Sequence, residues 1–261
     1  MLGRGTILLG TVLLWRTVAP VMAFGVDIIS CGQDIPRGAV ADLRADLGCG
    51  PIGPGVLLGH RATLNLNGFS IAGSGAGGNG GVSCSGRRCT INGPGEIRGF
   101  AVGISGIGLR ITNLAVRSNT EAGVSILGGV LGVSNVVAND NGIGIFVPGG
   151  RRLHGSGLEA SDNAIAGIWA SGARVKLSRL SATRNGTHGG VFLAKSRRPR
   201  PLIVDSAIVD NAGLDAGYDV LTMRPTVKLV DSICHRGAIV RESQTPPTSI
   251  TVIRPLGCRD D

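Results

Sequence analysis

The sequence has 261 residues, which suffices for one domain of a repeat fold or for two small ones. Glycine contributes 44 residues while 43% of the chain is hydrophobic, so the composition excludes a disordered chain, and no collagen period is present. The net charge of +9 indicates an anionic partner, which the charge alone does not identify among polysaccharide, acidic lipid and nucleic acid.

The N-terminus has the pattern of a secretory signal in residues 1–23. Arg4 supplies the positive charge, 6–15 a short apolar run, and Val21-Met22-Ala23 a small-residue cleavage site. Arg16 and Pro20 interrupt the apolar run, so we expect no membrane-spanning segment here, and no later stretch is long and apolar enough to be one. We therefore expect a secreted or periplasmic protein.

Residues 24–54 precede any regular repeat and are expected to cap the next domain. This segment contains VDIIS and AVADLRADL, which fit either short strands or one short helix. The terminal apolar layer of a solenoid needs such a cover.

The central stretch repeats with a fixed period of 22 residues. Four segments, 108–119, 130–141, 152–163 and 174–185, align without gaps, and each ends in asparagine: Asn119, Asn141, Asn163 and Asn185. Apolar residues alternate within each segment, and pairs such as Gly103-Ile104 and Gly144-Ile145 begin each turn. A period of this length with strand-like alternation predicts a solenoid of stacked coils over 55–240, with 241–261 closing the end.

At this point the chain resembles right-handed parallel β-helix proteins of the pectin-lyase-like class, bacterial exported members included. The segments LNLNGFSIAGSG and INGPGEIRGF and the N-x(3–5)-G-V/I restarts carry the resemblance, together with CGQDI…DLGC near the start. It implies an all-β, single-domain right-handed β-helix of about seven or eight coils, each of about 22 residues. The class includes lyases, hydrolases, epimerases and proteins without a known reaction, so it does not decide the activity.

Strand alternation divides the repeat into inward and outward columns. Leu109, Leu131, Leu153 and Val175 form one inward column, and Ile111, Val133, Gly155 and Leu177 form a second. The asparagines are expected to be structural, because stacked amides hydrogen-bond to one another and to the backbone.

Basic side chains share an outward column of the same strands. Arg110, His154 and Lys176 occupy equivalent positions, with Gly132 in the same column, and Arg152 and Arg174 precede the strands by the same period. A hydroxyl column follows (Thr112, Ser134, Ser156 and Ser178), and no acid of these coils lies in either column. This alignment predicts a binding face for an anionic polysaccharide, formed by Arg110, Arg152, His154, Arg174 and Lys176 and extended by Arg197, Arg198 and Arg200. The alternative is a solvated face that aids solubility.

Three aromatic residues form another outward column, Phe146, Trp169 and Phe192. Trp169 is a candidate sugar-stacking residue, and the alternative is that the basic loop 193–201 or the C-terminal tail covers the column as a small second core.

Candidates for catalysis are few. The resembled lyases use acidic calcium ligands with a nearby Arg or Lys, and such carboxylates are missing from the basic face. The resembled hydrolases use paired Asp residues; Asp140 and Asp162 are 22 apart, but they directly precede ladder asparagines and fit turn stabilisation better. His188 only faintly echoes a Gly-His-Gly hydrolase element.

Six cysteines in an exported chain indicate disulfides, with fifteen possible pairings. Proximity in the chain favours Cys31–Cys49, Cys84–Cys89 and Cys234–Cys258. No cysteine or histidine spacing fits a zinc site, and no metal or cofactor is expected.

The sequence thus favours an exported β-helix protein that binds an anionic polysaccharide, without catalysis and without a nucleic-acid partner. A polysaccharide lyase or glycoside hydrolase, and a structural adhesin-like surface protein, remain the alternatives; the oligomeric state is undetermined.

Overall fold

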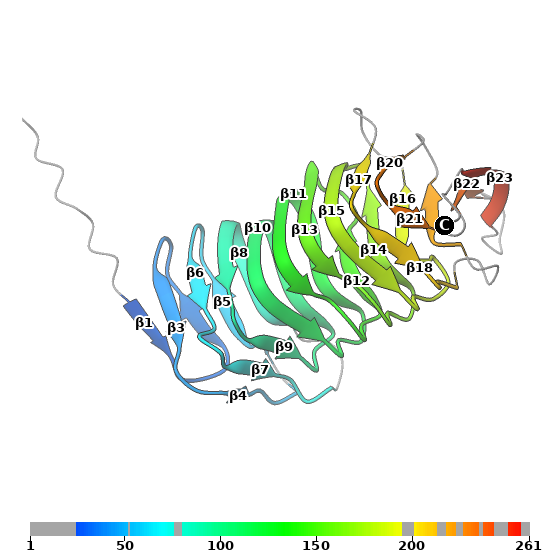
Figure 1. The fold of residues 1–261 in the computed structure, drawn as a ribbon. Helices are drawn as coiled ribbons and strands as arrows, with labels where there is room; N and C mark the ends of the chain where they lie inside the picture. The colour runs from blue at the N-terminus through cyan, green and yellow to red at the C-terminus, as the bar shows by residue number, and fades with distance from the viewer. Residues whose placement is uncertain are drawn as a thin grey trace, which may run out of the picture.

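A computed structural model describes residues 25–51, 53–75, 80–194, 201–212, 218–222, 227–234, 237–242 and 250–256. The described chain is a parallel β-solenoid of about eight coils, stacked along one axis from the N-terminal to the C-terminal end (Figure 1). The expected all-β repeat architecture is confirmed. The described residues include no helix long and apolar enough to cross a membrane.

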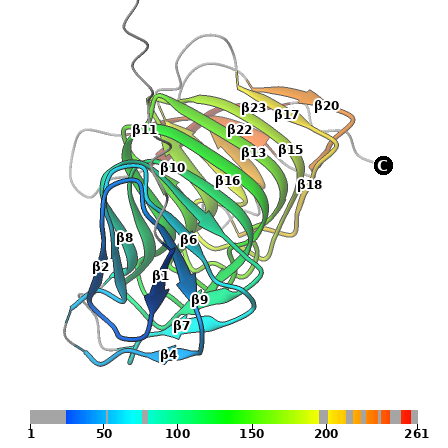
Figure 2. The same cartoon turned by 90° about the vertical axis from the view of Figure 1, so that its left-hand side faces the viewer.

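Each coil contributes one strand to each of three parallel sheets, and the sheets surround the core. Figure 2 shows this arrangement from the N-terminal end. Sheet 1 holds the strands that follow the glycine restarts: β2 (Gln33–Ile35), β5 (Val56–Leu58), β12 (Ile143–Val147), β14 (Ala166–Ser171), β16 (Val191–Ala194), β19 (Val220–Thr222) and β22 (Gly237–Glu242). Sheet 2 holds β1 (Gly25–Ile28), β3 (Val40–Leu43), β6 (Thr63–Asn65), β17 (Leu202–Val204) and β20 (Lys228–Val230). Sheet 3 holds β4 (Leu47–Gly48), β7 (Ser70–Ala72), β9 (Glu96–Arg98), β18 (Ala207–Val209) and β21 (Ile233–Cys234).

Five longer strands bend around the corners and belong to more than one sheet. These are β8 (Gly80–Asn92) in sheets 1 and 2, β10 (Val102–Arg117) and β11 (Ala122–Val137) in all three, and β13 (Arg152–Glu159) and β15 (Arg174–Thr183) in sheets 2 and 3.

The N-terminal segment, for which the sequence allowed either short strands or one short helix, forms strands. β2, β3 and β4 pair in parallel with β5, β6 and β7, and β1 lies outermost against β3. The solenoid core thus extends back to Ile28, which is 1% exposed. At the other end β23 (Ile250–Leu256) pairs antiparallel with β22.

The apolar ladders have the predicted register. Leu109, Leu131 and Leu153 are consecutive partners and are at most 3% exposed, and the restart residues Val124, Ile145 and Ile168 stack in sheet 1 without exposure. Gly155 interrupts an inward column for a steric reason, because an added Cβ would lie 2.5 Å from Leu158 Cδ1 and 2.8 Å from Leu177 Cδ2. Thin layers of aliphatic side chains therefore fill the core with little spare volume.

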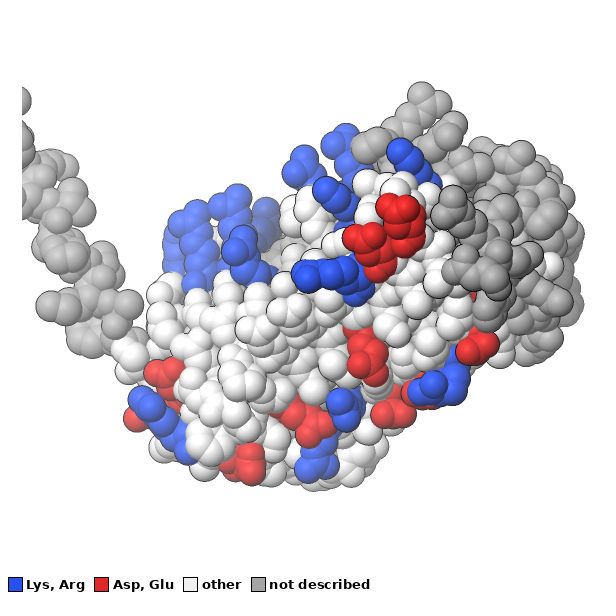
Figure 3. Space-filling view, viewed as in Figure 1, with Lys and Arg blue, Asp and Glu red and all other residues white. Residues whose placement is uncertain are grey.

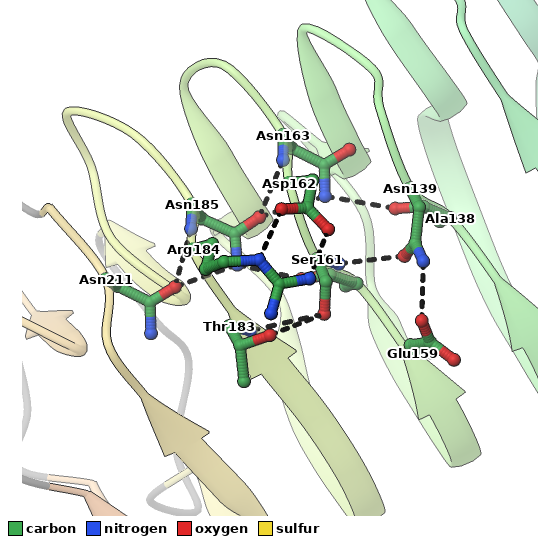
Figure 4. Close-up of polar contacts among 11 residues, drawn as sticks. Ala138, Asn139, Glu159, Ser161, Asp162, Asn163, Thr183, Arg184, Asn185 and Asn211 are labelled. Carbon is green, nitrogen blue, oxygen red and sulfur yellow. Dashed lines mark hydrogen bonds and ion pairs between the residues drawn. The ribbon is translucent and has the colours of Figure 1, made fainter.

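The asparagines form a hydrogen-bonded ladder at the turn from sheet 3 to sheet 1, as predicted. Figure 4 shows its later members, Asn163, Asn185 and Asn211. The Oδ1 atoms of Asn141, Asn163 and Asn185 each accept from the backbone N–H of the asparagine one coil earlier, at 3.0–3.1 Å, and Asn119 Oδ1 accepts from Phe100 N at 3.1 Å. Asn211 continues the ladder, and Asp219 Oδ1 accepts from Asn211 at its end. The sequence period missed these last two, because the insertion around 193–201 breaks the spacing.

Two of the three predicted disulfides are present, Cys31–Cys49 at the first coil and Cys84–Cys89 within β8. Cys234 is buried and disulfide-bonded, while its expected partner Cys258 lies outside the described residues.

Candidate functional site

The basic side chains predicted to align do lie side by side on sheet 2. Arg152 of β13 pairs in register with Arg174 of β15, and His154 pairs with Lys176. All four are exposed. Arg110 shares the column but lies two coils before His154, with Gly132 between them.

The charges of this group are uncompensated within the described part of the chain. There, Arg110, Arg152, Arg174 and Lys176 form no ion pair; the ion pairs found involve Arg44, Arg98 and Arg184. Parallel strands lie about 4.8 Å apart, so cations on neighbouring coils repel one another unless an anion lies between them. Arg197, Arg198 and Arg200, the predicted extension, are outside the described residues.

A groove adjoins this group at the turn from sheet 1 to sheet 2. Its volume is about 1030 Å³, and its cationic lining consists of Arg87, Arg88, Arg110 and Arg151. Glycines at 108, 128, 129 and 132 leave it hollow, and a Cβ on Gly132 would meet no atom within 4 Å. The sequence alone did not place Arg87, Arg88 or Arg151 here, because these residues lie at the bends before the sheet 2 strands and not in the outward column of Arg110.

The distribution of charge over the surface is uneven. In Figure 3, Lys and Arg gather along the upper edge over the coils from β6 to β15, whereas along the lower edge acidic and basic groups are mixed. The upper edge therefore offers the larger positive potential to an approaching polyanion.

The hydroxyl column beside the basic residues is in register and continues further than predicted. Toward the N-terminus it becomes a hydrogen-bonded chain in which Thr112 donates to Asn92, Asn92 to Asn65 and Asn65 to Asp42, at 2.9–3.0 Å. An acid therefore lies at the far end of this column. Hydrogen bonds from Asn65 and Asn67 to Asp42, the last acceptor of the chain, lower the pKa of this carboxyl.

The aromatic column forms a small second cluster on sheet 1. Trp169 stacks on His188 with ring centroids 4.7 Å apart, and it meets Phe146 and Phe192 edge to face at 5.6 Å and 5.0 Å. Phe192 is buried beside Leu221. The rings thus form a small cluster of their own. Most of the loop expected to cover them lies outside the described residues, so both sugar stacking on Trp169 and a covered second core stay predictions.

Asp140 and Asp162 lie at the asparagine turn, on the corner opposite the basic groove. Both have left-handed backbone conformations (φ 57°), and with Arg184 and Asp210 they line an open hollow of about 730 Å³. Asp162 accepts two hydrogen bonds from Arg184, each 2.6 Å long, and the pKa of Asp162 is lowered by this guanidinium (Figure 4). A carboxylate held ionised in this way is suited to turn stabilisation and not to general acid work.

His188 stacks on Trp169, and its Nδ1 lies 3.1 Å from Thr187 Oγ1. Within the described ranges no three His, Cys, Asp or Glu side chains come together as a metal ligand set.

Comparison with known proteins supports the fold. The model of the family described as right handed beta helix region matches residues 60–230. No curated protein matches the sequence. Among solved structures, pectate lyase Pel9A has a TM-score of 0.40 at 14% identity, over 80% of this chain and 72% of its own. The A-module of the Azotobacter vinelandii mannuronan C-5 epimerase AlgE4 has 0.37 at 16%, over 79% and 80%.

The enzymatically active domain of the bacteriophage CBA120 tailspike protein 2 has a TM-score of 0.45 at 12% identity. The match covers 83% of this chain but only 43% of the tailspike domain. At these TM-scores and identities, the three structures give no information on the activity of this chain, and the family match alone identifies the family.

Proposed function

Because this chain belongs to the right-handed β-helix family, we propose that it is an exported protein that binds an anionic polysaccharide on the outward face of sheet 2. The observation that carries the proposal is the register of β13 and β15, which sets Arg152 beside Arg174 and His154 beside Lys176. Arginine binds carboxylate or sulfate through two parallel hydrogen bonds, so two stacked arginines suit successive charges of a polymer.

The groove supports the same interpretation. It provides about 1030 Å³ of open space between Arg88, Arg110 and Arg151, and its glycine floor admits a bulky sugar chain. An extended ligand that lies across the coils would contact Arg110 and His154 on either side of Gly132.

Export is supported by the N-terminal sequence pattern and by the two disulfides at the first and third coils, since such bonds persist in oxidising compartments. The mature protein would then meet cell-wall or extracellular polysaccharides.

The test is equilibrium binding of a polyuronate to the full protein. Replacing Arg152 and Arg174 together by alanine is expected to weaken binding about tenfold or more, because both bidentate contacts are lost. The matched control replaces Arg98 and Arg117, exposed arginines on sheet 3, and removes the same charge. Equal affinities of the two double variants would refute the proposal.

The same preparation separates binding from catalysis. Incubation with pectate, alginate and hyaluronan, followed by the absorbance of unsaturated ends and by reducing sugar, is expected to give no product. Product formation would establish the lyase or hydrolase alternative instead.

A further inference from the structure

Four arginines and one histidine form a cluster at the turn from sheet 1 to sheet 2 of the first three coils. Arg37, Arg61, Arg87 and Arg88 are exposed and surround the half-buried His60. Backbone hydrogen bonds fix their stacking, since Gly38 N donates to His60 O and Arg61 N to Arg87 O, both at 3.0 Å.

Two of these arginines occupy a backbone position at which other coils use glycine. Arg61 (φ 60°) and Arg88 (φ 62°) stack with Gly38, Gly108 and Gly129, whose φ values are 72°, 68° and 79°. The left-handed region disfavours any side chain with a Cβ, so an arginine there is retained against a local strain.

Other arginines in this conformation have side-chain partners, whereas these do not. Arg179 donates to Ser156 Oγ, and Arg184 pairs with Asp162. In the ranges that the structure describes, neither Arg61 nor Arg88 has an ion pair or side-chain hydrogen bond, and Arg37 and Arg87 have no ion pair either.

The positive charge of the cluster also affects the protonation of His60. Arg87 N donates to His60 Nδ1 at 3.3 Å, which leaves the proton of the neutral ring on Nε2. Burial and the four surrounding guanidinium groups lower the pKa of His60. The cluster thus disfavours a further cation and favours an anion.

We infer that this arginine cluster is a binding site for the sulfate groups of a sulfated polysaccharide. Its residues differ from the Arg152–Arg174 pair and it does not depend on that pair's function, although Arg87 and Arg88 also line the groove that adjoins the pair.

Charge density favours sulfate esters over uronate carboxylates here. The four guanidinium groups come from three coils, which span about 10 Å at the usual strand spacing. A polyuronate carries one carboxylate per sugar ring, whereas a highly sulfated polysaccharide carries more than one charge per ring and so matches the two arginines of the third coil. Guanidinium forks bind the oxygens of sulfate in pairs.

The experiment compares a heparin-derived oligosaccharide with its desulfated, N-acetylated counterpart of equal length on the full protein. The test variant carries Arg61→Gly and Arg88→Gly, which suit the left-handed backbone and so preserve the fold. The control carries Arg98→Gln and Arg117→Gln, with the same loss of charge.

We expect the sulfated oligosaccharide to bind about tenfold or more tightly than the desulfated one, and the glycine variant to lose this preference while the control keeps it. Heparin is also expected to raise the pKa of His60 in an NMR titration, because an anion stabilises the imidazolium. The Arg152→Ala, Arg174→Ala protein should retain both effects, which separates this site from the proposed polyuronate site.

Three results would overturn the inference: equal binding of the two oligosaccharides, full heparin affinity in the glycine variant, or tighter binding of a double-stranded DNA oligonucleotide than of heparin.

Discussion

At the scale of single residues, the same amino acid has different roles according to the column it occupies. Asn141 is 3% exposed and belongs to the ladder, whereas Asn113 is exposed and occupies a left-handed bend position (φ 53°). The repeat predicted the ladder residues correctly, because their period is exact and every member is buried by the same turn.

Replacing Asn141 by alanine should lower stability substantially. Its Oδ1 accepts from Asn119, and its Nδ2 donates to Val116 O and Asn139 O, so alanine leaves several buried backbone groups without partners. We expect a loss of about 2–4 kcal/mol in the free energy of unfolding, measured by denaturant titration.

Asn113→Gly is the control, since glycine tolerates the bend and the amide there accepts only a solvent-exposed hydrogen bond from Asn135; the expected change is within about 0.5 kcal/mol. A loss for Asn141→Ala no larger than the control's would argue against a stabilising ladder.

At the scale of strands and turns, the sequence predicted the middle coils better than the first ones. Between Gly108 and Asn185 the 22-residue period gave the inward columns and the alignment of Arg152 with Arg174. In the early coils the turns differ in length, and Arg61 and Arg88 are 27 residues apart. Their alignment follows from the backbone of two turns, which period analysis does not reveal.

The groove also could not be predicted from the sequence, because it depends on the geometry of the turns. Its hollow arises because glycines from two neighbouring coils come together in space, and its lining mixes outward strand residues with turn residues such as Arg151. The repeat period identifies the outward strand residues but not the turn residues.

The Asp162–Arg184 pair gives the turn a dependence on pH. The guanidinium lowers the pKa of Asp162, so the stabilisation is present above the usual aspartate pKa of about 3.9 and is lost as the pH falls through the lower folded-state value. The side chains are 36% and 65% exposed, so Arg184→Gln should cost less than about 1 kcal/mol at pH 7.

That cost should disappear near pH 2, whereas Arg117→Gln, which removes an exposed arginine without an ion-pair partner among the described residues, should show no such trend. Chemical unfolding at both pH values provides the comparison. A cost for Arg184→Gln that stays constant with pH would exclude the ion pair as its cause.

At the scale of the whole molecule, different sides of the solenoid carry different groups of side chains. The asparagine ladder and the paired Asp162 and Arg184 stabilise one corner, and the rings around Trp169 cover part of sheet 1. The uncompensated cations concentrate along the remaining edge and on sheet 2 (Figure 3). A long polyanion lying along this edge would contact several coils at once, which strengthens binding through many modest contacts.

The most direct test of the proposed binding face uses its lysine. A carbodiimide joins a lysine amine to a uronate carboxylate as an amide only when the two groups are in contact. With a polyuronate oligomer on the full protein, we predict cross-linking at Lys176, lost at high salt and in the Arg152→Ala, Arg174→Ala protein. Mass spectrometry that found no oligomer on Lys176, or as much of it on Lys176 in the Arg152→Ala, Arg174→Ala protein as in the unchanged protein, would contradict the account.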